Sequence, residues 1–159
     1  MSEHKVYPVP KEFENHTHIR NDQYLAMYDA SVNRSDEFWS QKADEFITWF
    51  KPWNKLTESD FDQGEAKWFL GAELNASYNC IDRHLELKAD HTAIIWEGDE
   101  PDQHRHITYR ELHEEVCKFA NVLKANGAKK GDRITIYMPM IPEAAVAMLA
   151  CVRIGAVHS

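Results

Sequence analysis

The chain has 159 residues, of which 43% are hydrophobic and 28% are charged, and its formal net charge is −8. These values are typical of one globular domain and exclude a disordered chain. The longest basic run is Lys129-Lys130, so we expect no nucleic-acid partner, because nonspecific binding needs clustered Lys and Arg. The longest apolar run, 144–152, is well short of the ~20 residues that cross a bilayer. We therefore expect no membrane association.

No apolar stretch follows Met1, so the start of the chain does not resemble a secretory signal. Cys80, Cys117 and Cys151 lie more than thirty residues apart, which fits neither a disulfide framework nor a zinc site. We expect three buried thiols in a cytoplasmic protein.

Residues 1–20 lack a helical period, and we interpret them as a tail. A first helix is predicted over Asp22–Val32. A second begins at Ser35, which is a good N-cap, and should continue through Phe50 until Pro52 stops it.

Nine aromatic residues lie between positions 38 and 69. A platform that stacks sugars or bases is one explanation. Because several of these rings recur at helical spacing, we favour packing of a small helical subdomain against a larger body. Within this aromatic-rich region, only residues 68–70, just before Gly71, are predicted to be extended.

Asn75 should cap a third helix over Ala76–Leu85. A hairpin is then predicted, with strands at 92–97 and 104–108 joined by a turn that contains Gly98 and Pro101.

Thr108 and Glu111 have the spacing of a capping box, which opens a helix that ends at Gly127. A short buried strand should cover Ile134–Met138. Pro142 suits the first position of the next helix, Pro142–Ile154, and the opening of another strand follows Gly155. This last helix carries apolar residues on nearly all of its faces, so we expect it to be buried on more than one side.

Recognisable catalytic chemistry is missing from this sequence. The strand-to-helix link at 138–142 has no glycine, although a phosphate cradle needs glycines there, and no P-loop or dinucleotide fingerprint occurs. His104, His106 and His113 suggest a zinc site, but a solvated edge strand explains the first two as well. Asp82-Arg83-His84 is best interpreted as an ion-paired helix terminus.

Four segments resemble, in order, the AMP-forming acetate–CoA ligases (acetyl-CoA synthetases). They cover 67–85, 107–113, 131–143 and 153–159, and Ala72 stands where the family pattern suggests glycine. The likeness spans about residues 21–159. The sequence of residues 78–84, Tyr-Asn-Cys-Ile-Asp-Arg-His, resembles the acetate enzymes more than the propionate or acetoacetate enzymes.

The resemblance implies an α/β fold in which a helical N-terminal cap precedes the first hairpin, strands and helices of an adenylate-forming large domain, here truncated. The implied divisions are a tail at 1–20, the cap at 21–85 and the incomplete adenylating domain at 86–159. The intact enzyme would use acetate, ATP, Mg²⁺ and coenzyme A, and this part alone would be inactive with none of them bound.

The family's catalytic and ligand-binding motifs lie downstream, so no catalytic, cofactor-binding or metal-binding residue is assigned here. The resemblance implies scaffold roles instead. Residues expected to join the cap to the body are Trp68, Asn75, Asp82, Arg83 and Tyr109, and those expected to turn the first strand into its helix are Pro139 and Pro142.

Two alternatives remain open. The chain could be a stand-alone interaction module that uses its aromatic-rich region, or it could come from a propionate or acetoacetate ligase. As part of a larger sheet it should self-associate through exposed strand edges.

Overall fold

The computed structural model describes residues 7–14 and 16–159. By its internal contacts the chain divides into two units, Met1–Phe46 and Ile47–Ser159. The predicted tail lies partly outside the described residues, and its described part contains a short helix, α1 (Lys11–Glu14).

The first unit continues with α2 (Asn21–Asn33) and α3 (Ser35–Phe46). The helix predicted at 22–32 is therefore confirmed. On α2 the rings of Tyr24 and Tyr28 stack against each other with centroids 6.2 Å apart, but both side chains remain exposed.

The prediction that the second helix continues to Phe50 was wrong. Beyond Phe46 the backbone finds partners far away in the sequence: the Thr48 N–H donates to Asn79 Oδ1 at 2.7 Å, and the Phe50 N–H donates to the Glu73 carbonyl at 2.7 Å. These bonds replace the helical ones.

An antiparallel hairpin that was not predicted from the sequence provides the first two strands of the second unit. It pairs β1 (Lys55–Asp60) with β2 (Glu65–Leu70), so the extended piece expected at 68–70 is the end of a longer strand. Trp49, Trp53 and Phe69 pack their rings together with centroid separations of 5.2 Å for each pair. The expectation that the aromatic residues pack within a helical subdomain is therefore wrong for these three, because their rings lie outside helices.

The third predicted helix is broken. It consists of α4 (Ala76–Cys80), the 3₁₀ turn η1 (Asp82–His84) and α5 (Leu85–Lys88). Ile81, which is fully buried, interrupts the helix with φ −125° and ψ −67°. At this break the Ile81 side chain packs in the buried core of the second unit, and this burial stabilises the fold.

The hairpin β3 (Thr92–Glu97) and β4 (His104–Thr108) is confirmed, with antiparallel pairing and a register shift between Thr92 and Ile94. The Thr108–Glu111 capping box is also confirmed. It opens α6 (Tyr109–Ala125), where Glu111 N–H donates to Thr108 Oγ1 at 3.2 Å and Thr108 N–H donates to Glu111 Oε2 at 2.8 Å.

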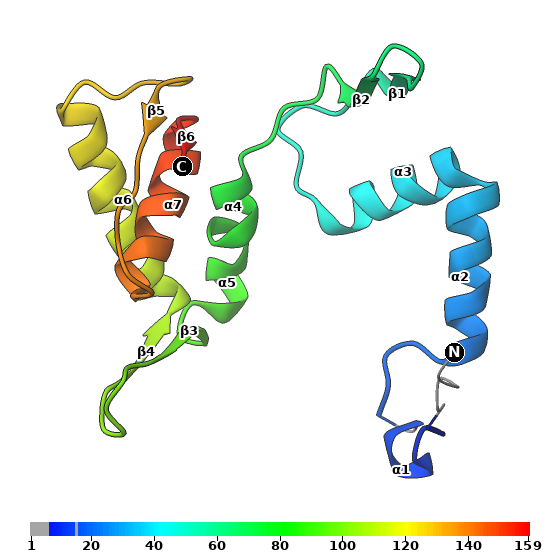
Figure 1. Ribbon diagram of the computed structural model, residues 1–159, viewed down its shortest axis with the longest axis horizontal. Helices are drawn as coiled ribbons and strands as arrows, with labels where there is room; N and C mark the ends of the chain where they lie inside the picture. The colour runs from blue at the N-terminus through cyan, green and yellow to red at the C-terminus, as the bar shows by residue number, and fades with distance from the viewer. Residues whose placement is uncertain (1–6, 15) are drawn as a thin grey trace, which may run out of the picture. The chain divides into compact units, whose positions relative to one another are not determined.

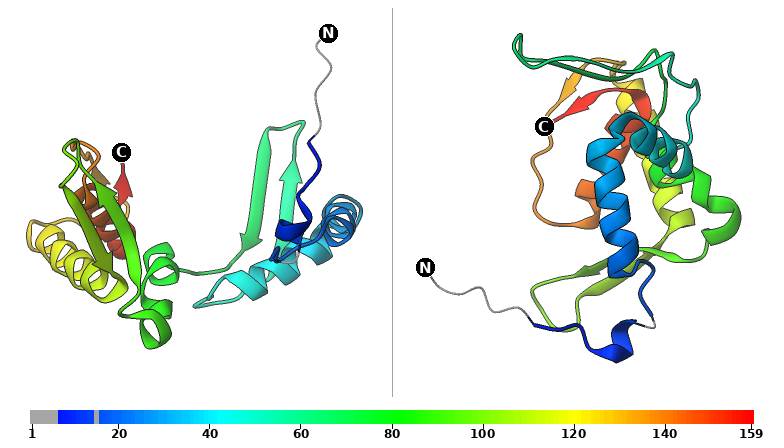
Figure 2. Two further views of the ribbon diagram at one scale, coloured as in Figure 1. Left: turned by 90° about the horizontal axis from the view of Figure 1, so that it is seen from below. Right: turned by 90° about the vertical axis from the view of Figure 1, so that its right-hand side faces the viewer.

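The helix α7 (Pro142–Ile154) has the predicted bounds and lies beside α6 (Figure 1, Figure 2). Gly155, in the left-handed region at φ 74°, ends it, and β6 (Val157–His158) follows. On α7 the buried residues are Pro142, Ala147, Ala150 and Cys151, while Met148 is 45% exposed.

The predicted strand at 134–138 was too long and too buried. Only β5 (Arg133–Ile134) is a strand, paired in parallel with β6, although the Ile136 N–H still donates to the Ser159 carbonyl at 2.7 Å. Tyr137 and Met140 are exposed. A strand needs a partner along its length, and within this chain β6 provides one for only a few residues.

A cluster of buried side chains forms the core of the second unit: Ile81, Ile107, Leu112, Val116, Ala120 and Ala150. Apart from Ile81, its members come from β4, α6 and α7. The expectation of three buried thiols holds only for Cys151, since Cys80 is exposed and Cys117 is half-buried.

Candidate functional site at the junction of three helical segments

Asn75 connects two helices through one side chain. Its Oδ1 accepts the Tyr78 N–H at 3.2 Å and so caps α4, as predicted. Its Nδ2 donates to the Arg153 carbonyl at 3.0 Å and approaches the Val152 carbonyl at 3.4 Å, both in the last turn of α7. The carbonyls at a helix end lack intrahelical partners, so this amide satisfies groups at the start of one helix and the end of another.

Asp82 and Arg153 form the strongest contact in this region. The Asp82 carboxylate accepts two hydrogen bonds from the Arg153 guanidinium, each 2.7 Å long. The Asp82 side chain is 16% exposed and that of Arg153 is 25% exposed. Burial disfavours the charged form of Asp82, but the bonds and charge of Arg153, with a smaller contribution from His113, outweigh it and lower the pKa of Asp82.

His113, on α6, completes this group of residues. Its Nε2 lies 3.4 Å from Asp82 Oδ1, from an Arg153 nitrogen and from Cys117 Sγ. We call Asn75, Asp82, His113, Cys117 and Arg153 the helical junction. A Cys–His–Asp relay requires the acid and the nucleophile on opposite ring nitrogens, whereas here both approach Nε2. The junction therefore ties η1, α6 and α7 together and lacks the arrangement of a nucleophilic triad.

The predicted scaffold residue Arg83 takes part in a second set of contacts, centred on Asn79. Its guanidinium donates to Asn79 Oδ1 at 3.1 Å, and Asn79 also bonds the backbone of Thr48 through both ends of its amide. Asp82 thus contacts α7 directly, whereas Arg83 is connected to the segment before β1 through Asn79.

Tyr109 and Trp68 have different surroundings. The ring of Tyr109 lies 5.6 Å from that of His84, and its N–H donates to the His91 carbonyl at 3.1 Å. Trp68 lies half-exposed on β2, opposite Thr57. A role for Trp68 in joining a cap to a body stays a prediction.

The link from β5 to α7 is held by the β3–β4 hairpin. Trp96 Nε1 donates to the Met140 carbonyl at 2.8 Å, and Arg105 forms an ion pair with Glu143 at 2.8 Å. Pro142 is at the start of α7, as predicted, and the Pro139 carbonyl accepts the Ile141 N–H at 2.9 Å. These contacts stabilise the turn between β5 and α7, which the two prolines were expected to make.

The three-histidine zinc hypothesis does not fit this arrangement. His104 and His106 share a face of β4, with rings 6.1 Å apart, but His113 contacts the helical junction instead. Across residues 7–14 and 16–159, no group of three His, Cys, Asp or Glu side chains is arranged to hold a metal ion. Nor, in the described residues, is any helix long and apolar enough to cross a bilayer.

Sequence reasoning identified Asp82 but missed its partner. Arg153 is 71 residues away and was noted only as part of a family-like segment. Neither His113 nor Cys117 was connected with Asp82, because the contact depends on how α6 and α7 pack. The one available signal was a lone arginine in the last turn of a helix whose only other charged residue is Glu143, in the first turn.

Two family models match consecutive parts of the chain. One, described as acetyl-coenzyme A synthetase N-terminus, matches residues 24–80, and the other, described as AMP-binding enzyme, matches residues 81–159. They meet at Ile81, beside Asp82. Residues 81–159, which make up most of the second unit, therefore belong to the class of the AMP-binding enzymes.

Curated relatives resemble the chain over its whole length. The acetyl-coenzyme A synthetases of Halorhodospira halophila and Saccharophagus degradans are 57% and 59% identical over 159 residues, which is 100% of this chain and 25% of each relative. Among solved structures, the acetoacetyl-CoA synthetase of Streptomyces lividans has a TM-score of 0.78 and 31% identity, over 86% of this chain and 21% of that one. The chain belongs to the acetyl-coenzyme A synthetase family and spans about a quarter of the length of these curated relatives.

Proposed function

We propose that this chain is the N-terminal part of an AMP-forming acetate–CoA ligase and that the activity belongs to the longer protein. The observation that carries the proposal is the identity of 57–59% with acetyl-coenzyme A synthetases over all 159 residues. The alternative of an isolated interaction module does not explain why likeness extends through both units without interruption.

The proposed reaction has two steps. The acetate carboxylate attacks the α-phosphorus of ATP, giving acetyl-AMP and pyrophosphate, and the thiol of coenzyme A then displaces AMP to give acetyl-CoA. Adenylation is needed because a carboxylate is anionic and has no good leaving group. Mg²⁺ would stabilise the charge that develops on the phosphate oxygens.

The residues of this chain are proposed to act as scaffold, with no catalytic, cofactor-binding or metal-binding residue among them. The described residues do not fit a Mg²⁺ site, since they contain no suitable group of acidic or imidazole ligands. The 138–142 link has no glycine to bring backbone N–H groups close to a phosphate. Residues that bind ATP, coenzyme A and the metal are therefore assigned to the rest of the protein.

The proposed divisions are a tail at 1–20, a helical cap at 21–85 and the start of the adenylating domain at 86–159. The two family models support a boundary near this point, since they meet at 80 and 81. The helical junction would hold the end of the cap segment to α6 and α7 through Asn75 and Asp82.

We further propose a cytoplasmic protein whose partners are the small molecules acetate, ATP and coenzyme A. The chain by itself should self-associate, because the exposed Tyr137 and Met140 follow a strand that is paired for only two residues.

Product analysis tests the reaction. The whole protein, incubated with acetate, ATP, Mg²⁺ and coenzyme A, should give acetyl-CoA, AMP and pyrophosphate in equal amounts. Parallel reactions with propionate and acetoacetate test the acyl group, and acetate should give the highest kcat/KM. Formation of ADP and phosphate, or a higher kcat/KM with either other acid, would contradict the proposal.

A further inference from the structure

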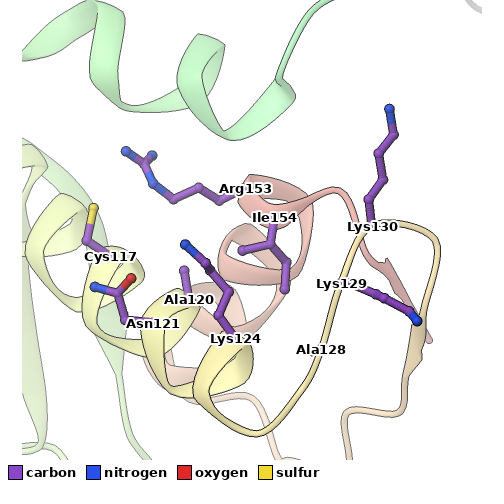
Figure 3. Close-up of a pocket in the computed structure, with 9 residues that line it drawn as sticks. All are labelled: Cys117, Ala120, Asn121, Lys124, Ala128, Lys129, Lys130, Arg153 and Ile154. Carbon is purple, nitrogen blue, oxygen red and sulfur yellow. The ribbon is translucent and has the colours of Figure 1, made fainter.

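A pocket of about 490 Å³ lies between the C-terminal half of α6, the turn before β5 and the end of α7 (Figure 3). Its nine lining residues are Cys117, Ala120, Asn121, Lys124, Ala128, Lys129, Lys130, Arg153 and Ile154. Ala120 is buried, and Ala128 and Ile154 are half-buried. The pocket therefore has a small apolar floor and a polar rim.

Four of the lining residues are cationic, and none is acidic. This is unusual for a chain whose formal net charge is −8. Two nearby carboxylates already accept hydrogen bonds. Asp82 accepts two from the Arg153 guanidinium, and Asp132 Oδ2 accepts one from the backbone N–H of Lys129 at 2.9 Å.

The three lysines of this pocket have no ion pair within residues 7–14 and 16–159. Elsewhere the chain does pair its lysines with carboxylates, as at Lys42, Lys51, Lys55, Lys67 and Lys118. Like charges repel one another, so placing the unpaired Lys124 beside the Arg153 guanidinium, with two further unpaired lysines on the far side of the pocket, is unfavourable until an anion neutralises this charge (Figure 3).

The geometry of the pocket brings cations to it from two sides. The Lys124 side chain extends to the same side as the Arg153 guanidinium, with Asn121 and Cys117 beside them (Figure 3). On the other side, Lys130 lies across Gly155, where an added Cβ would come within 3.0 Å of Lys130 Cγ. Glycine at 155 thus leaves room for Lys130 to lie along the rim.

We propose that this pocket binds an anion with two or more adjacent phosphate groups. One carboxylate or a single phosphate is smaller than the pocket and would leave part of its positive charge uncompensated. An inorganic polyphosphate and a nucleoside polyphosphate share the required chemistry. The inference is independent of the proposed acetate activation, because no residue of the pocket is assigned to that reaction.

Calorimetric titration of the 159-residue chain with tripolyphosphate, and separately with ADP, tests the proposal. Tripolyphosphate should bind with one site per chain, and the double variant Lys124→Gln/Lys130→Gln should weaken its binding at least tenfold. The matched control, Lys67→Gln/Lys118→Gln, removes the same charge from ion-paired positions outside the pocket and should change the affinity less than twofold. ADP binding tighter than tripolyphosphate would identify a nucleotide as the source of the phosphates.

Thermal melts of the same samples supply a second readout. Tripolyphosphate should raise the melting temperature of the parent and of the control, since a ligand stabilises the folded state that binds it, but not that of the pocket variant. Equal weakening in the two double variants, or no binding and no thermal shift in the parent at millimolar tripolyphosphate, would overturn the proposal.

Discussion

Asp82 accepts two hydrogen bonds of 2.7 Å from Arg153, a residue 71 positions further along the chain. Asp82 follows the break in the helical segment at Ile81, and Arg153 is in the last turn of α7. Both residues lie in the segment 81–159 that the AMP-binding enzyme model matches, and Asp82 lies next to the position where the two family models meet.

Replacing Asp82 with Asn should reduce the free energy of unfolding by about 2–3 kcal/mol, because it leaves the largely buried Arg153 without its counter-charge. Urea denaturation measures the change. The control is Asp90→Asn, which breaks the exposed pair with Arg110 and should cost less than about 0.5 kcal/mol. Similar losses in the two variants would contradict the importance assigned to the Asp82 pair.

The contribution of Asp82 should depend on pH. Its pKa is lowered in the folded state from the ordinary value of 3.8, so the folded state favours the ionised carboxylate. The stabilisation should therefore be complete above pH ~5 and disappear as the pH falls below ~4 through the folded-state pKa. Urea melts of parent and Asp82→Asn at several pH values give the difference directly. A difference that stays constant down to pH 2 would rule this origin out.

Ser77 is fully buried in α4, and its hydroxyl has no hydrogen-bond partner among the described residues. An unpaired buried hydroxyl is unfavourable and alanine is a better helix former, so Ser77→Ala should stabilise the chain by about 0.5–1 kcal/mol. As a control, Thr108→Ala removes a hydroxyl that caps α6 and should cost about 1 kcal/mol. Equilibrium unfolding distinguishes the two, and a loss above ~1 kcal/mol for Ser77→Ala would contradict the assignment.

Phe69 has a φ of 53°, in the left-handed region, while its ring packs with Trp49 and Trp53. Both Phe69→Ala and Phe69→Gly lose the ring, but only glycine also removes the backbone strain. Phe69→Gly should therefore be more stable than Phe69→Ala by about 1 kcal/mol.

The neighbouring Trp68 in β2 provides the comparison for this pair. There, glycine should be less stable than alanine by about 0.5–1 kcal/mol, the ordinary order in a strand. Finding the ordinary order at Phe69 as well would show that its conformation stores little strain.

Elements whose ends are fixed by local chemistry were predicted well. The Thr108–Glu111 capping box and the Pro142 start each depend on residues within one turn, and the structure places both as expected. Gly155 likewise ends α7 in the left-handed conformation that glycine favours.

Features that depend on distant partners were not predictable in this way. The second helix ends early because Thr48 and Phe50 bond to Asn79 and Glu73, and the β1–β2 hairpin carries charged and polar residues without a clear alternation. For the same reason the sequence revealed Asp82 but not Arg153. Local patterns identify the acid, whereas only the packing of α6 and α7 identifies its partner.

Acetate-dependent exchange of labelled pyrophosphate into ATP tests the central claim most directly, when it is measured on the whole protein and on the 159-residue chain side by side. We predict exchange by the whole protein that requires acetate, and no exchange above background by the 159-residue chain. Exchange catalysed by the 159-residue chain, or no acetate-dependent exchange by the whole protein, would contradict the proposal that this chain is the N-terminal part, without catalytic residues, of an acetate-activating ligase.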